Sequence, residues 1–196
     1  ITAGELVQEV ARDTIFYDQS GGGVTFSGGE PLAQPAFLEA LLRGCRERGL
    51  RTCVDTSGVA PQATVLRIAP LAGLFLYDLK HMDVEQHRRF TGMGNELSLA
   101  NLEALLRAGS RVILRIPVIT GVNDDPVNID AVGRFLRRTG ASPDVVLLPY
   151  HRTGEDKYAR LGRPYRLAGL AVPDAGKLEE LAARLRACGL AVQIGG

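Results

Sequence analysis

Residues 74–83 read LFLYDLKHMD, and this stretch decides the fold class. Its first part, Leu74 to Leu79, is a mostly apolar run of strand length, as expected for a strand buried on both faces of a parallel sheet. Its end turns polar at Asp78, Lys80 and His81, where the strand passes into a loop. A buried strand with charged residues at its carboxyl end is typical of α/β proteins, which bind ligands there.

Predicted strands and helices alternate on both sides of this stretch. Further strands are expected at 22–26, 52–55, 111–119, 145–148 and, as a short one, 192–194. Expected helices lie at 35–48, 61–69, 84–90, 97–108, from Pro126 onward and at 173–188, after a first helix with Leu6, Val7, Val10, Ala11 and Ile15 on one face and a Thr2–Glu5 capping box. This alternation predicts a parallel sheet, in an open doubly wound or a closed or partial barrel arrangement.

Length and composition indicate one compact domain over residues 1–196. Hydrophobic residues make up 45% of the chain, charged residues 23%, and the net charge is +1. This balance argues against a nucleic-acid surface, which needs a basic excess. No apolar run is long enough for a membrane span, and the first residues lack a signal-peptide pattern. We therefore expect no nucleic-acid or membrane partner and a cytoplasmic location.

The three cysteines, Cys45, Cys53 and Cys188, do not form a recognisable site. None lies within four residues of another, so neighbouring residues cannot supply an iron–sulfur or zinc motif. We interpret them as free thiols that pack as small apolar side chains.

Polar residues follow five of the six predicted strands. They belong to the segments SGGEP (27–31), DTSG (55–58), DLKH (78–81), TGVNDD (120–125, after Arg115 within its strand) and PYH (149–151). Because the carboxyl ends of parallel strands lie at one edge of a sheet, these segments are expected to converge on one active site.

Several of these residues have a structural alternative. Glu30, beside Pro31, could equally cap the following helix. Asp55 and Thr56 offer hard oxygen ligands for a cation or a ligand's ammonium group, or they could form a side-chain turn leading to Gly58.

The charged residues of the later strands also allow two interpretations. Asp78 and Lys80 could form a plain ion pair, and Lys80 could instead be a Schiff-base lysine. Arg115 could hold a carboxylate or serve as an ion-pair partner. His151 is assigned to the site because of its place at a strand end, whereas His81 and His87 are interpreted as surface residues.

Glycines mark the exit of the first strand. Gly28 and Gly29 would let the backbone approach a ligand closely, whereas residues 21–23 are expected to form only a turn.

The ordered motifs GGGVTFSGGEPL, CVDTSG, YDLKHMD, ILRIPVITGVND and LLPYH resemble the activating enzymes of glycyl radical enzymes. This radical S-adenosylmethionine (SAM) family includes the pyruvate formate-lyase activator as its best-known type. The resemblance extends at least to LLPYHRTGEDKY, and it implies a partial (β/α)6-type TIM-like barrel of parallel strands.

The resemblance also implies roles for individual residues. Asp55, Thr56 and Asp78 match a monovalent-cation site beside the SAM carboxylate, with a backbone carbonyl near Leu76. The SAM-contacting positions are Gly28, Gly29, Glu30, Asp78, Leu79, Lys80, Arg115 and His151.

Such enzymes bind a [4Fe–4S] cluster through CxxxCxxC and cleave SAM reductively to a 5′-deoxyadenosyl radical. The radical takes a hydrogen atom from a glycine of a partner glycyl radical enzyme, such as pyruvate formate-lyase. The family implies a flavodoxin or ferredoxin type electron donor.

The sequence departs from the family at one decisive place, since it contains no CxxxCxxC motif. We expect the cluster ligands and the family's first barrel strand to precede Ile1, together with a possible ferredoxin-like insert. On this view the chain alone would not cleave SAM.

Two alternatives belong to other functional classes. One is an aldolase-like barrel that forms a Schiff base through Lys80, although GGE and DTSG have no role in that scheme. The other is a binding domain of the same fold that holds a partner without chemistry.

Overall fold

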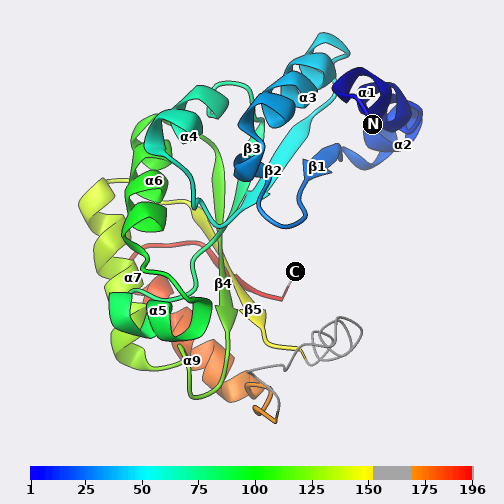
Figure 1. Cartoon of the computed structure of the whole chain (residues 1–196). Coiled ribbons are helices and arrows are strands. Elements are labelled where there is room, and N and C mark those ends of the chain that lie inside the picture. The colour runs from blue at the N-terminus through cyan, green and yellow to red at the C-terminus, as the bar shows by residue number, and fades with distance from the viewer. Residues whose placement is uncertain (152–168, 196) are drawn as a thin grey trace. The chain divides into compact units, whose positions relative to one another are not determined.

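The computed structural model describes residues 1–151 and 169–195, and it shows alternating helices and strands (Figure 1). The strands lie in the sheet in chain order, and the pairs β1–β2, β2–β3 and β5–β6 are parallel. They are β1 (Val24–Phe26), β2 (Thr52–Thr56), β3 (Leu74–Asp78), β4 (Val112–Val118), β5 (Asp144–Pro149) and β6 (Val192–Ile194). The expected α/β class is confirmed.

The helices lie where the apolar periodicity places them, with small shifts at their ends. They are α1 (Ala3–Ala11), α2 (Thr14–Ser20), the short 3-10 helix η1 (Pro31–Ala33), α3 (Pro35–Glu47), α4 (Gln62–Ile68), α5 (Val84–Thr91), α6 (Glu96–Arg107), α7 (Pro126–Thr139) and α9 (Ala175–Arg186). None of the described helices is both long and apolar enough to cross a membrane.

The chain divides into two compact units. Unit 1 comprises residues 1–78 and 96–114, and unit 2 comprises residues 79–95 and 115–196, so the boundary passes through β4. The interpretation of residues 1–196 as a single domain stays a prediction.

In unit 1, helix α1 packs along α3 (Figure 1). Val7 of α1 and Leu38, Leu41 and Leu42 of α3 are buried at helical spacing. In β2 burial alternates, with Thr52, Val54 and Thr56 buried and the residues between them half-buried. One face of this strand is thus packed, and the other keeps Asp55 accessible.

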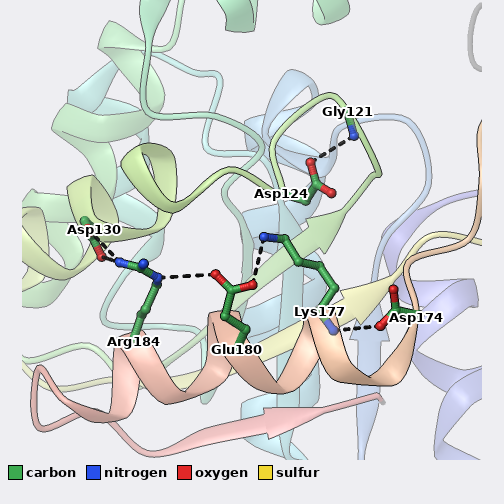
Figure 2. A network of polar contacts seen from close by, with 7 residues as sticks. All are labelled: Gly121, Asp124, Asp130, Asp174, Lys177, Glu180 and Arg184. Atoms are coloured by element: carbon green, nitrogen blue, oxygen red, sulfur yellow. Dashed lines mark hydrogen bonds and ion pairs between the residues drawn. The ribbon is translucent and has the colours of Figure 1, made fainter.

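In unit 2, α9 packs on α7, and charged side chains tie the two helices together. Figure 2 shows Lys177 beside Glu180, and Glu180 beside Arg184, which reaches Asp130 of α7. The Arg184 Nη1 to Asp130 Oδ2 distance is 3.1 Å. Asp174 caps α9 by accepting a hydrogen bond from the Lys177 backbone N–H. The apolar face of α9 beneath these charges consists of Leu178, Leu181, Ala182 and Leu185.

The first predicted helix is in fact two helices. The Thr2–Glu5 capping box forms as expected, but the helical ladder is interrupted at Arg12 and Asp13. The Thr14 hydroxyl donates to the Ala11 carbonyl at this break. Ile15 consequently lies on α2 and is 67% exposed, so its assignment to the buried face is wrong. Local hydrogen bonding overrode the apolar spacing here.

Candidate functional site

The candidate site residues lie at or just after the carboxyl ends of strands in both units, except Arg115, which lies within β4. Gly28, Gly29, Glu30, Asp55, Thr56 and Asp78 belong to unit 1, and Leu79, Lys80, Arg115 and His151 belong to unit 2. The convergence of both sets on one site stays a prediction.

The turn after β1 presents backbone rather than side chains. Gly28 and Gly29 have φ values of +87° and +48°, a region that side chains disfavour. Both are exposed, and a Cβ atom at either position would meet no atom within 4 Å. Their glycine identity is therefore explained by backbone conformation, and the turn leaves its peptide groups accessible to a ligand.

Glu30 ties this turn to the end of β2. Its Oε1 accepts hydrogen bonds from the Leu32 backbone N–H at 3.1 Å and the Thr56 hydroxyl at 2.6 Å. Its Oε2 accepts from the backbone N–H and the hydroxyl of Ser57, at 3.0 and 2.7 Å. The helix-capping alternative for Glu30 is thus present, because the Leu32 bond caps η1. The carboxylate in addition fixes the position of the loop after β2.

The loop after β2 is held by a second group of buried atoms. The Gly58 N–H donates to the Thr56 hydroxyl at 2.9 Å, so the side-chain turn weighed from the sequence forms at Thr56. The Asn101 amide donates to the carbonyls of Gly58 and Ala60, both at 2.7 Å. The Ser98 hydroxyl of the same helix, α6, donates to the Ser57 carbonyl. The DTSG segment is therefore rigidly anchored.

Tyr77 packs beneath this loop. Its hydroxyl donates to the Ser98 carbonyl at 2.6 Å, and burial raises the pKa of the phenol far above its ordinary value. A neutral tyrosine therefore supports the loop from below.

Asp55 and Asp78 are half-buried at the carboxyl ends of β2 and β3. The Ser27 hydroxyl donates to Asp55 Oδ2 at 3.1 Å. Thr56 faces the other way, because successive side chains alternate across a strand, and it is only 3% exposed. Toward a cation beside Asp55, Thr56 could offer its backbone carbonyl, since its hydroxyl is already bonded to Glu30.

The loop after β3 in unit 2 is clamped by buried asparagines. The Asn123 amide donates to the carbonyls of Lys80 and Pro117, at 2.8 and 2.6 Å, and its Oδ1 accepts from the Ile119 N–H at 2.8 Å. Asn95 donates to the His81 and Met82 carbonyls, and Asn128 accepts from the Met82 N–H. Lys80 thus extends into solvent from a fixed backbone.

The other candidate residues of unit 2 differ in exposure. Arg115 is half-buried in β4, and its carbonyl accepts from the Leu79 N–H at 2.9 Å. The Leu79 side chain belongs to the core, so only its backbone could face a ligand. His151 is exposed at the last residue before the undescribed segment. Of the resembling LLPYHRTGEDKY stretch, residues 152–158 lie outside the described residues.

His81 and His87 are not surface residues, contrary to the sequence interpretation. They are 7% and 6% exposed, respectively. His81 Nδ1 accepts from the Asp83 N–H at 2.9 Å, and burial lowers the pKa of its imidazole, opposed by Asp125 and Asp83. His87 Nδ1 lies 2.7 Å from the Met93 carbonyl. Each ring is thus bonded to a backbone group of a segment that flanks α5, and the local sequence pattern does not reveal these bonds.

The described side chains do not supply an iron–sulfur site. Cys45 is buried in α3, and Cys53 and Cys188 are half-buried in different units. Among residues 1–151 and 169–195 no group of three His, Cys, Asp or Glu residues could hold a metal ion.

Sequence reasoning missed the supporting residues of the site. Sequence patterns give no individual role to Ser57, Tyr77, Ser98, Asn95, Asn101 or Asn128, and they indicate Asn123 only as part of the TGVNDD segment (120–125). The sequence signal for such residues is a polar side chain at a helical position that the apolar periodicity places toward the core. Asn101 and Asn128 are two examples, and both are buried within helices. A buried amide needs partners, and here the partners are loop carbonyls.

Comparison with known proteins identifies a family pattern. The pattern of the Radical SAM superfamily matches residues 2–130. The (2S)-3-sulfopropanediol dehydratase activating enzyme of Klebsiella oxytoca is 41% identical over 170 residues, which are 86% of this chain and 54% of the relative. The trans-4-hydroxy-L-proline dehydratase activating enzyme of Clostridioides difficile is 40% identical over 195 residues, 98% of this chain and 64% of the relative. The chain thus spans between half and two thirds of these relatives.

A solved structure extends the likeness to the fold. A domain of a pyruvate-formate lyase-activating enzyme from Bacteroides vulgatus superimposes with a TM-score of 0.77 at 35% identity. The match covers 89% of this chain and 99% of that domain. The expected fold type is therefore confirmed.

Proposed function

The chain belongs to the radical SAM superfamily and, within it, to the activating enzymes of glycyl radical enzymes, and from this premise we propose that it forms the SAM-binding core of such an activase. The superfamily uses SAM and a [4Fe–4S] cluster. The reaction proposed for the whole protein is reductive cleavage of SAM, followed by hydrogen abstraction from a glycine of a partner enzyme. A flavodoxin or ferredoxin type donor would supply the electron.

The observation that carries this proposal is the arrangement of unit 1 at the ends of β1, β2 and β3. The turn at Gly28 and Gly29 leaves backbone groups accessible, and Asp55 and Asp78 present carboxylates beside them along the sheet edge. SAM is zwitterionic and carries a sulfonium, so it needs accessible peptide groups together with charged side chains. The chemistry of these donors fits that ligand.

In unit 2, three cationic or ionisable residues would complete the ligand's surroundings. We assign Lys80, Arg115 and His151 to contacts with SAM, because an extended lysine, a strand arginine and a strand-end histidine can bind a carboxylate or adenosine polar atoms. Glu30 acts through the loop after β2, which it positions by three hydrogen bonds, one from Thr56 and two from Ser57. Leu79 would contribute through its backbone.

The partner is proposed to be a glycyl radical enzyme. Pyruvate formate-lyase is one candidate, while the curated relatives activate a sulfopropanediol dehydratase and a hydroxyproline dehydratase. A cytoplasmic location and the absence of nucleic-acid and membrane partners remain predictions. The known relatives do not favour an aldolase-like role for Lys80. A whole protein that binds a glycyl radical enzyme without cleaving SAM would instead indicate the non-catalytic binding role.

SAM binding to this chain tests the proposal directly. Isothermal titration should show saturable SAM binding that Lys80→Ala and Asp55→Asn weaken. Asp144→Ala, an exposed residue at the amino end of β5 and outside all of these segments, serves as control and should bind normally. Binding that is absent, or equal in all these proteins, would overturn the proposal.

The activity needs the gene's whole product. The residues encoded before Ile1 should include CxxxCxxC, and the anaerobic whole protein should produce a glycyl radical signal on its partner in electron paramagnetic resonance. An upstream sequence without this motif, or a whole protein that binds a glycyl radical enzyme but never cleaves SAM, would contradict the activase function.

A further inference from the structure

Unit 1 contains a pocket at the ends of the strands opposite to the candidate site. Its volume is about 670 Å³, within the range of small-molecule sites. The residues that directly precede β1, β2, β3 and β4, namely Gly23, Arg51, Gly73 and Arg111, all line it. The pocket therefore lies at the amino ends of these strands and is separate from the proposed SAM site.

The lining of this pocket is cationic. Arg46, Arg51 and Arg111 come from three different segments, and the lining contains no Asp or Glu. Other arginines of the unit pair with carboxylates, as Arg43 and Arg67 do with Glu39. The three pocket arginines have no such pair among the described residues. Like charges gathered in a concave site raise the local concentration of anions.

Two of these guanidinium groups are held in place by backbone carbonyls. Arg51 Nη1 donates to the Gly21 carbonyl at 2.7 Å, and Arg46 Nη1 donates to the Pro70 carbonyl at 3.5 Å. Each bond uses one donor of a group with several, so donors remain for a ligand. The planar fork of arginine suits the oxygens of a phosphate.

The floor of the same pocket is apolar. Leu50, Leu71 and Leu74 line it together with Pro70 and Ala72. A ligand that fills this space would place an apolar part on the leucines and an anionic group among the arginines. An inorganic ion alone would leave the apolar floor uncovered.

From this combination we infer that the pocket binds a small organic phosphate, at a second site distinct from that of SAM. The arginines take the phosphate through charge-assisted hydrogen bonds, and the leucine floor takes the organic group. The inference does not depend on the proposed function, because it uses only the amino-terminal ends of the strands.

Phenyl phosphate and inorganic phosphate are suitable probes, since neither contains adenine. Titration calorimetry with the whole chain should show saturable binding of phenyl phosphate, tighter than that of inorganic phosphate. Arg111→Gln and Arg46→Gln should each weaken it about tenfold, the effect of losing one charge-assisted contact. Arg48→Gln removes an exposed arginine of the same helix end outside the pocket and should leave binding unchanged.

Thiol labelling locates the ligand independently. Cys53 lines the pocket, whereas Cys188 lies in unit 2, and both are half-buried. Phenyl phosphate should slow alkylation of Cys53 and not of Cys188. Absence of saturable binding, equal loss in Arg48→Gln, or equal affinity for both probes would overturn the inference. Unchanged melting temperatures of the ligand-free variants exclude misfolding as the cause of lost binding.

Discussion

At the scale of single residues, the loop after β2 depends on a close approach between Gly58 and Tyr77. A Cβ atom at position 58 would lie 1.6 Å from the Tyr77 hydroxyl oxygen, and Gly58 has a φ of +71°. Steric exclusion and backbone conformation therefore both demand glycine here. Asp55 and Thr56 lie directly before this loop. The absence of a Cβ atom at position 58 therefore allows the loop to pack on Tyr77 beside two candidate site residues.

Gly58→Ala tests this constraint. We expect it to lower the free energy of unfolding by about 2–5 kcal/mol, the sum of left-handed strain and overpacking. Gly49→Ala is the matched control, since Gly49 has nearly the same φ, +70°, but open space around its Cβ position. It should cost only about 1–2 kcal/mol. If urea denaturation showed equal losses in the free energy of unfolding for the two variants, the close approach of position 58 to Tyr77 would contribute nothing to the effect.

His81 gives unit 2 a pH-dependent stability. Its folded-state pKa lies below the ordinary value of 6.5, chiefly through burial, while Asp125 and Asp83 oppose the shift and His87 adds to it. The unfolded chain therefore binds a proton more readily than the folded chain as the pH falls below about 6.5. Stability is consequently lost on acidification through this range.

His81→Asn should reduce that loss, because asparagine does not titrate and its Oδ1 can still accept the Asp83 N–H. The free energy of unfolding, measured from about pH 7 to about pH 5, should fall less steeply in the variant than in the parent. An identical pH slope in both proteins would exclude His81 as the source.

At the scale of elements, buried amides join loops that the strands alone would leave loose. Asn123 is 2% exposed and links the loop after β3 to the end of β4 through three hydrogen bonds. The exposed ion pair of Arg184 and Asp130 in Figure 2 contributes little to stability, because solvent screens both charges. Such a pair is worth about 0–1 kcal/mol. The loop that carries Lys80 is therefore held by hydrogen bonds from buried amides.

Asn123→Ala should loosen the segment that carries Lys80. Removing the amide leaves two carbonyls and one N–H without their partner, which costs about 2–4 kcal/mol if the segment remains closed. We expect faster amide hydrogen exchange at 80–83 and a smaller change elsewhere. Asp124→Ala, which removes a single bond to the Gly121 N–H, is the neighbouring control. Exchange that is equally slow in both variants would contradict a clamp.

The elements themselves were largely predictable from sequence, because apolar periodicity and caps are local properties. The ends of β2, β3 and α7 followed from DTSG, DLKH and Pro126. The break at Asp13 and the burial of His81 were not predictable, since both depend on hydrogen bonds and loop packing. Glu30 was correctly recognised as a possible cap, but its contacts with Thr56 and Ser57 join segments 26 residues or more apart. No local pattern encodes such contacts.

At the scale of the whole molecule, two units share one strand, and the chemistry assigned to the chain is divided between them. In the proposed assignment, unit 1 would supply accessible backbone and carboxylates, and unit 2 would supply Lys80, Arg115 and His151. Family membership is carried by residues 2–130, which span nearly all of unit 1 and about one third of unit 2. The relatives are considerably longer than this chain.

The distribution of thiols over the two units yields a prediction about the cluster. Unit 1 offers only Cys45 and Cys53, of which Cys45 is buried, and unit 2 offers only Cys188. A [4Fe–4S] cluster is held by several thiolates that converge on it. We therefore expect this chain, incubated anaerobically with iron and sulfide and then desalted, to retain no stoichiometric iron and no iron–sulfur absorption. Retention that disappears in Cys53→Ser or Cys188→Ser would mean that these thiols do ligate a cluster, and it would show that the family's cluster motif is dispensable in this protein.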